Sequence, residues 1–172
     1  LIFCTLCAIQ LSIEVIFWGP TVDTSIEVDT LLLTFLPPLM ILATIIVSDK
    51  FPEPPKLIFN TFLLGCLICA PAGYLNLYLS AILGISEGAV AGFVEETLKL
   101  LAFFMLIWDR IEFDEPMDAI VYGTCISLGF ATHENYTYVY MLADDLGHNA
   151  YHVALIRATT AILGHTCFGI IM

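Results

Sequence analysis

Apolar segments of similar length recur along the whole chain, and this pattern limits the possible folds more than any other feature. The segments cover residues 1–18, 31–48, 57–83, 86–108, 116–142 and 151–172. Each is close to the ~20 residues that a helix needs to cross a bilayer. Only 13% of the residues are charged, whereas soluble domains carry about 25%. The sequence therefore predicts an all-α fold, a polytopic transmembrane helical bundle of about six helices.

The chain shows no internal repeat and no low-complexity tract, so we expect a single membrane-embedded domain over residues 1–172. Proline-containing polar turns, FPEPP at 51–55 and EFDEP at 112–116, separate apolar segments. Segment 1–18 lacks a basic start and contains Glu14, so we expect a helix of the bundle and not a signal peptide. Both ends lie inside apolar runs, and we expect both to be trimmed.

The distribution of charge excludes one class of partner and predicts an orientation. The net charge of −12 makes nucleic acid an unsuitable partner. Lys50 and Lys56 lie in the second of the expected connections, and Arg110 lies in the fourth. Basic connections remain on the cytoplasmic side of a membrane. We therefore expect a multi-pass protein of the cytoplasmic membrane, with both ends of the chain inside.

Several ionisable residues lie at membrane depth, where they usually face the bundle interior or a wet cavity. They are Glu14, Glu95, Glu96, Lys99, His133, Glu134, Arg157 and His165, with Asn76 as a weaker member. A helical rise of 1.5 Å per residue puts Glu95 and Glu96 about 15 Å below the outer surface. The same rise puts His133 and Glu134 about 12 Å deep and His165 about 20 Å deep. Three helices should thus bring acids and imidazoles to similar levels in the outer half.

Helical spacing assigns faces to the residues of segment 86–108. Gly84, Gly88 and Gly92 repeat every four residues, and Glu96 continues the row. Small residues at this spacing let helices approach closely in membranes, so we expect a neighbouring helix against this row. Glu95 and the lysine four residues later, Lys99, are placed to form an ion pair.

These groups suit the activation of water. A glutamate can act as general base toward water, and an imidazole can stabilise the developing oxyanion. Alternatively, Glu96, His133 and His165 could hold Zn²⁺ with an open position for water. The HExxH pattern of many zinc proteases is absent, because Thr137 stands where the second histidine would be. A metal site would therefore need ligands from several helices, and a metal-free glutamate mechanism stays open.

Four short motifs follow one another over residues 86–170. They are EETLK at 95–99, EPMDAIVYG at 115–123, LGFATHEN at 128–135, and Arg157 followed by GHTCFG at 164–169. In combination they resemble the PrsW-type intramembrane proteases, which are related to CAAX-processing and bacteriocin-maturation enzymes. Residues 1–85 match this family only in being hydrophobic.

The resemblance implies a polytopic protease that cleaves membrane-anchored regulators such as anti-sigma factors. It implies that Glu95 and Glu96 are the paired glutamates and that Lys99 is the lysine of the first motif. Glu134 matches the acid of a later motif and His165 the histidine of the last.

We therefore expect an intramembrane endopeptidase. The catalytic residues would be Glu95, Glu96, Glu134 and His165, and the supporting residues would be Lys99, His133, Arg157, Asn135 and Asp118, with Tyr122 and Tyr138 in the surrounding layer. The alternative from another class is an ion- or proton-coupled transporter or channel that uses the same buried acids. Discontinuous helices and inverted repeats would favour a transporter, and the sequence shows neither. A catalytically inactive relative is a third hypothesis, which the intact EExxK motif and His165 disfavour.

Overall fold

The computed structural model describes residues 27–143 and 147–172, and within these ranges the chain is helical with no strand. The elements are α2 (Val28–Ser48), α3 (Pro55–Leu83), α4 (Glu87–Leu106), α5 (Pro116–Thr137), the π-helix η1 (Tyr138–Leu142), α6 (Ala150–Thr159) and α7 (Ala161–Ile171). The all-α prediction is confirmed. Counting α6 and α7 as one gives five helical segments in the described ranges, one fewer than expected, and segment 1–18 lies outside the described residues.

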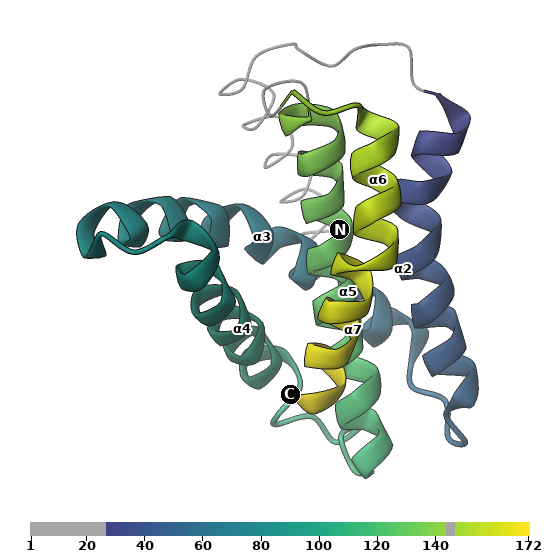
Figure 1. Cartoon of the computed structure of the whole chain (residues 1–172). Helices are drawn as coiled ribbons and strands as arrows, with labels where there is room; N and C mark the ends of the chain where they lie inside the picture. The colour runs from purple at the N-terminus through teal and green to yellow at the C-terminus, as the bar shows by residue number, and fades with distance from the viewer. Residues whose placement is uncertain (1–26, 144–146) are drawn as a thin grey trace.

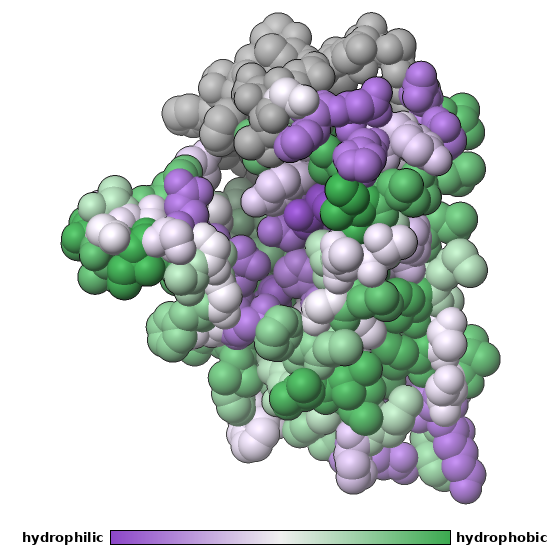
Figure 2. All heavy atoms as spheres, viewed as in Figure 1, coloured by the Kyte–Doolittle hydropathy of each residue, from purple (hydrophilic) through white to green (hydrophobic). Residues whose placement is uncertain are grey.

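Three of the described helical segments are long and apolar enough to cross a membrane: α2, α3 and the α6–α7 unit, Ala150–Ile171. Large apolar side chains on their outer faces are exposed, for example Leu32 and Met40 on α2. Figure 2 shows hydrophobic surface over much of the visible face. Such surface is unfavourable in water and favourable in lipid. The protein is therefore a multi-pass integral membrane protein, as the sequence predicts.

Helix α5 is the centre of the bundle, and α2, α3, α4 and α7 all pack against it. Its residues Val121, Cys125 and Leu128 are fully buried together with Leu42 of α2 and Ile162 of α7. Figure 1 shows α3 and α4 extending together to one side of the bundle, with α4 returning toward its lower end. Glu87 and Glu95 of α4 and His133 and Glu134 of α5 line one cavity on this side of α5.

Two glycine contacts hold α3 against α5. A Cβ atom on Gly129 would lie 2.1 Å from the carbonyl oxygen of Phe62, and one on Gly65 would lie 2.1 Å from that of Ile126. No side chain fits at such distances from a neighbouring backbone. These glycines therefore set the closest approach between the two helices.

The expected glycine packing row on α4 is wrong. A Cβ atom on Gly84, Gly88 or Gly92 would meet nothing within 4 Å. Gly84 instead ends α3 in the left-handed conformation with φ of 65°, which glycine adopts without strain. Gly88 lines an open cavity, so among the described residues no helix packs closely against this glycine row.

Helix α5 begins with a reciprocal capping arrangement that fixes Asp118. Pro116 occupies its first turn, and Glu115 and Asp118 form a capping box. Sixteen residues separate Asp118 from Glu134, which corresponds to about 24 Å along the helix. Asp118 therefore lies at the opposite end of α5 from the expected catalytic residues and does not support them directly.

Candidate active site

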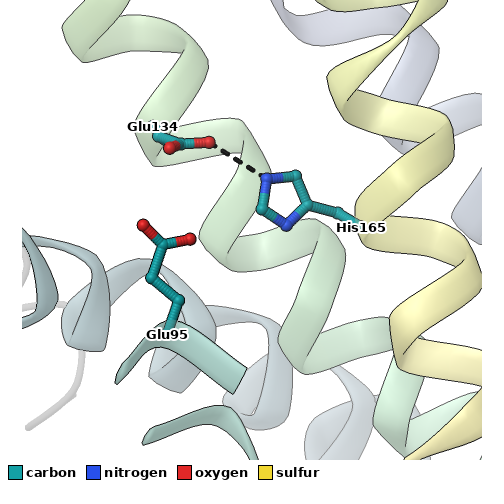
Figure 3. Close-up of side chains that lie close together, drawn as sticks. All are labelled: Glu95, Glu134 and His165. Carbon is teal, nitrogen blue, oxygen red and sulfur yellow. Dashed lines mark hydrogen bonds and ion pairs between the residues drawn. The ribbon is translucent and has the colours of Figure 1, made fainter. Parts of the chain in front are cut away.

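Glu95 of α4, Glu134 of α5 and His165 of α7 lie together. One carboxylate oxygen from each glutamate and one ring nitrogen of His165 all lie within 4.8 Å of one another. Figure 3 shows the three side chains pointing toward a common point from three different helices. His165 Nε2 lies 3.0 Å from Glu134 Oε2. The sequence predicts similar depths for these residues on three helices, and the structure places their side chains close together.

Lys99 is completely buried and links two members of the site. Its Nζ donates to Glu96 Oε1 at 2.7 Å and lies 3.0 Å from His165 Nδ1. It also lies 4.3 Å from the centre of the Phe130 ring, close enough for a cation–π contact. An ammonium group can only donate hydrogen bonds, so Nδ1 must accept and the ring proton must lie on Nε2. Nε2 then donates to Glu134.

Arg157 of α6 balances the charge of Glu134. Its Nη2 donates to Glu134 Oε2 at 2.5 Å, and its Nε donates to Asn135 Oδ1 at 2.7 Å. The guanidinium lies 4.3 Å from the centre of the Tyr138 ring. Asn135 in turn donates to the carbonyl oxygen of Thr34 on α2 at 3.3 Å. Arg157, Asn135 and Tyr138 therefore surround Glu134 and fix its position.

The structure distinguishes the two adjacent glutamates. The expected ion pair between Glu95 and Lys99 is wrong, because Lys99 pairs with Glu96 at i, i+3. Glu95 Oε1 accepts a hydrogen bond from Asn76 Nδ2 of α3 at 3.1 Å. Among the described residues no Lys, Arg or His forms an ion pair with Glu95. Its carboxylate is thus hydrogen-bonded and has no ion-pair partner among the described residues.

A cavity of about 450 Å³ opens beside these groups, between α3, α4, α5 and η1. Its lining includes Glu95, Glu134 and His133, together with Asn76 and Glu87. Figure 2 shows hydrophilic residues gathered in the middle of this face, with hydrophobic surface around them. A cavity of this size, with carboxylates in its lining, has room for several water molecules, since each occupies about 30 Å³ in the liquid. The site can therefore supply both water and space for a peptide segment.

The expected zinc ligands Glu96, His133 and His165 are not brought together. In the described part of the chain, the metal-compatible group at this end is Glu95, Glu134 and His165. Glu96 faces Lys99, and His133 lines the cavity with its ring 6.5 Å from that of Tyr136. The π-helix η1 follows directly after this stretch of α5, and π-turns inside helices are frequent at functional sites.

Residues 53–172 match the sequence model of one protein family, described as PrsW family intramembrane metalloprotease. The chain belongs to this family. The matched range contains all four motifs from which the resemblance was inferred, and the PrsW resemblance is confirmed.

Curated proteins named Protease PrsW are similar to the chain. The one from Oceanobacillus iheyensis is 33% identical over 141 residues, which is 79% of this chain and 62% of the relative. Those from Geobacillus kaustophilus and Bacillus subtilis are 32% and 31% identical over 79% of this chain, and 60% and 62% of their own lengths. The chain thus spans less than two thirds of these PrsW relatives. No solved structure matches it.

Asn76 is a residue of the site whose importance the sequence analysis underestimated. It lies on α3, outside the four PrsW motifs, and is buried with its amide toward Glu95. The available signal was an amide in the middle of a long apolar helix, where an unsatisfied polar group is costly.

Proposed function

We propose that this chain is the catalytic membrane region of an intramembrane endopeptidase. The observation that supports this function is the environment of Glu95, which lines the cavity together with Glu134 and has no basic ion-pair partner among the described residues. Such a carboxylate can accept a proton from water. The neighbouring Glu134–His165 pair lies within 4.8 Å and supplies a positioned imidazole.

In this mechanism a cavity water gives a proton to Glu95 while its oxygen attacks the carbonyl carbon of the scissile peptide bond. The carbonyl oxygen becomes negatively charged, and His165 stabilises it by sharing with it the Nε2–H that otherwise donates to Glu134. Glu95 then passes the proton to the leaving nitrogen, and the C–N bond breaks to give a carboxylic acid and an amine. Arg157 keeps Glu134 ionised, so that Glu134 holds the His165 ring in place.

The same residues fit a zinc ion. Two carboxylates and an imidazole are a three-ligand set of the kind found in catalytic zinc sites, and the separation of their donor atoms requires only a small contraction. Bound there, Zn²⁺ would polarise the carbonyl and generate hydroxide from water. Glu95, Glu134 and His165 would hold it in place of the ligand set expected from the sequence.

The contact between Lys99 and His165 distinguishes the metal-free mechanism from the zinc-assisted one. A free electron pair on Nε2 requires the ring proton on Nδ1, where it would face Lys99 Nζ. A metal-assisted reaction therefore requires Lys99 to leave Nδ1 or to lose a proton. Chelator treatment followed by zinc addition distinguishes the routes. Activity that disappears and returns with one equivalent of zinc supports the metal, and activity that survives complete removal supports glutamate alone.

We further propose that the site lies in the outer half of the membrane. Lys50 and Arg110 lie in the connections that precede α3 and α5, and Lys56 lies in the first turn of α3, all away from Glu134 near the other end of α5. We take the first turn of α3 together with the connection before it. The positive-inside rule assigns those connections to the cytoplasm. A suitable substrate is a single-span regulator, for example an anti-sigma factor, whose cleavage point enters the cavity.

The test uses the full-length protein in detergent or liposomes with a library of membrane-anchored peptides. Glu95→Gln should reduce the cleavage rate by about 10²–10⁴-fold, because a positioned general base contributes that much. Glu87→Gln is the matched control, since Glu87 lines the same cavity from the first turn of α4. Cleavage that survives Glu95→Gln unchanged would contradict the proposal. So would a folded wild-type protein that cleaves no peptide but conducts protons.

A further inference from the structure

A second buried cluster of acids lies at the other end of α5. Asp49 follows α2, Glu53 lies in the connection to α3, and Asp118 is in the first turn of α5. The lower end of Figure 1 shows the end of α2 and the start of α5 at this level. One carboxylate oxygen from each residue lies within 4.8 Å of the others. All three side chains are buried, with 8%, 8% and 1% exposure.

The hydrogen bonds of the cluster leave one carboxylate incomplete. Asp118 Oδ2 accepts from the backbone N–H groups of Asp114 and Glu115. Glu53 accepts a short hydrogen bond from the Tyr122 hydroxyl. Asp49 Oδ1 accepts from a backbone N–H at 3.1 Å, but Asp49 Oδ2 is buried and has no hydrogen-bond partner. A buried charged oxygen without a partner is costly, so this oxygen indicates a missing ligand.

No fixed positive charge compensates these acids. Within residues 27–143 and 147–172 no Lys, Arg or His forms an ion pair with any of the three. Three carboxylates in contact therefore repel one another unless a cation joins them.

We propose that Asp49, Glu53 and Asp118 bind one hard divalent cation, Mg²⁺ or Ca²⁺, which ties the α2–α3 connection to the start of α5. Carboxylate oxygens are the preferred ligands of both ions. Two oxygens on opposite sides of Ca²⁺ stand about 4.6–5.2 Å apart, and around Mg²⁺ they stand about 4.2 Å apart. Oxygens within 4.8 Å of one another therefore lie near the spacing of Ca²⁺ ligands, and they would have to move closer together around Mg²⁺.

This cation site is separate from the proposed hydrolytic site. About 24 Å of helix separates Asp118 from Glu134, and the two metal-compatible groups share no residue. The donor sets also differ, because the cluster offers only oxygen, whereas the hydrolytic site offers an imidazole. Oxygen ligands favour Mg²⁺ and Ca²⁺, and imidazole favours zinc. The cation would serve to fix the bundle and would not take part in hydrolysis.

The experiment measures binding to the full-length protein in detergent micelles after chelator treatment and its removal. MgCl₂ and CaCl₂ are titrated separately in a calorimeter. We expect one bound ion per chain with at least one of the two salts, and the difference in affinity identifies the preferred ion. Wild-type protein that binds neither ion would overturn the proposal and indicate that the acids share a proton instead. His165→Ala should bind like wild type, and loss of binding in that variant would place the ion at the other site.

Asp49→Asn keeps the shape of the side chain and removes one charge. We expect the variant to bind the ion at least tenfold more weakly and to lose the rise in melting temperature that the ion gives wild type. Without the ion it should melt above wild type, because one repulsive charge is gone. Asp109→Asn, an exposed acid at the same end, is the matched control and should behave as wild type. Asp49→Asn with undiminished binding would contradict the assignment.

Discussion

Two buried polar clusters are held by the two ends of α5, and they solve the same electrostatic problem differently. Around Glu134, the acids Glu95 and Glu96 are accompanied by Lys99 and Arg157 from the chain itself. Around Asp118, the acids Asp49 and Glu53 are grouped without a basic ion-pair partner in the described residues. One cluster therefore contains its counter-ions, and the other needs one from solution.

The difference between the two clusters shows how a membrane protein can keep a reactive carboxylate at membrane depth. Lys99 and Arg157 neutralise Glu96 and Glu134, so Glu95 is the acid of this cluster that lines the cavity without an ion-pair partner in the described residues. The acids of the Asp118 cluster do not line the cavity beside Glu95, and they lie buried where a loop meets the start of α5. We infer that the first arrangement serves chemistry and the second serves architecture.

The largest effect on folding should follow from removing a built-in counter-ion. Arg157→Met leaves the Glu134 carboxylate without its partner and should lower the free energy of unfolding by about 3 kcal/mol, the lower end for a buried pair, because both side chains keep some exposure. Denaturant unfolding in micelles measures the change. Asp49→Asn, measured without divalent ions, should change stability in the opposite direction. If both substitutions destabilised the protein equally, the contrast between the clusters would fail.

A smaller effect should follow from separating α5 from α3. Gly129→Ala would place a methyl group 2.1 Å from the Phe62 carbonyl oxygen, so the helices must move apart. We expect a loss of about 1–3 kcal/mol, typical of overpacking, together with reduced cleavage. Gly88→Ala is the control, since its Cβ meets nothing within 4 Å and alanine favours the helix by about 1 kcal/mol. Equal stability of the two variants would show that the α3–α5 contact does not position the clusters.

The smallest effect should appear in the pH dependence of stability. The pKa of Glu53 is raised to about 7 by burial and by the charges of Asp118 and Asp49. The folded protein therefore holds a proton that the unfolded chain releases near pH 4.5, so stability should fall as the pH rises from about 4.5 to 7. Glu53→Gln should flatten this part of the melting-temperature profile, measured with chelator. An unchanged slope in that variant would assign the pH dependence to other groups.

Much of the fold could be predicted because segment length and hydropathy are local properties. Helices of ~20 apolar residues follow directly from bilayer thickness, and the constant rise of a helix brought Glu95, Glu134 and His165 to one level. The number of membrane-spanning helices was harder to predict than the fold class. Helices α4 and α5 contain the polar residues, and three of the described segments are strongly apolar.

The details of the site depend on side-chain choices that spacing does not determine. Both i, i+3 and i, i+4 pairs are sterically available to Lys99, and its contacts with His165 and Phe130 accompany the pairing with Glu96. The glycines of α4 also did not indicate which side of this helix packs against a neighbour. The partners of Asp118 could not be found at all, because Asp49 and Glu53 are more than 60 residues away and belong to no shared motif.

The most direct test of the account compares two neighbouring substitutions, Glu95→Gln and Glu96→Gln, in one cleavage assay with the full-length protein and a membrane-anchored peptide. We propose that Glu95, which lines the cavity, transfers the proton and that Glu96, which binds Lys99, neutralises the charge of that lysine. The cleavage rate of Glu95→Gln should fall by about 10²–10⁴-fold, and that of Glu96→Gln should fall by a smaller factor. A rate for Glu96→Gln as low as or lower than that for Glu95→Gln would contradict the assignment.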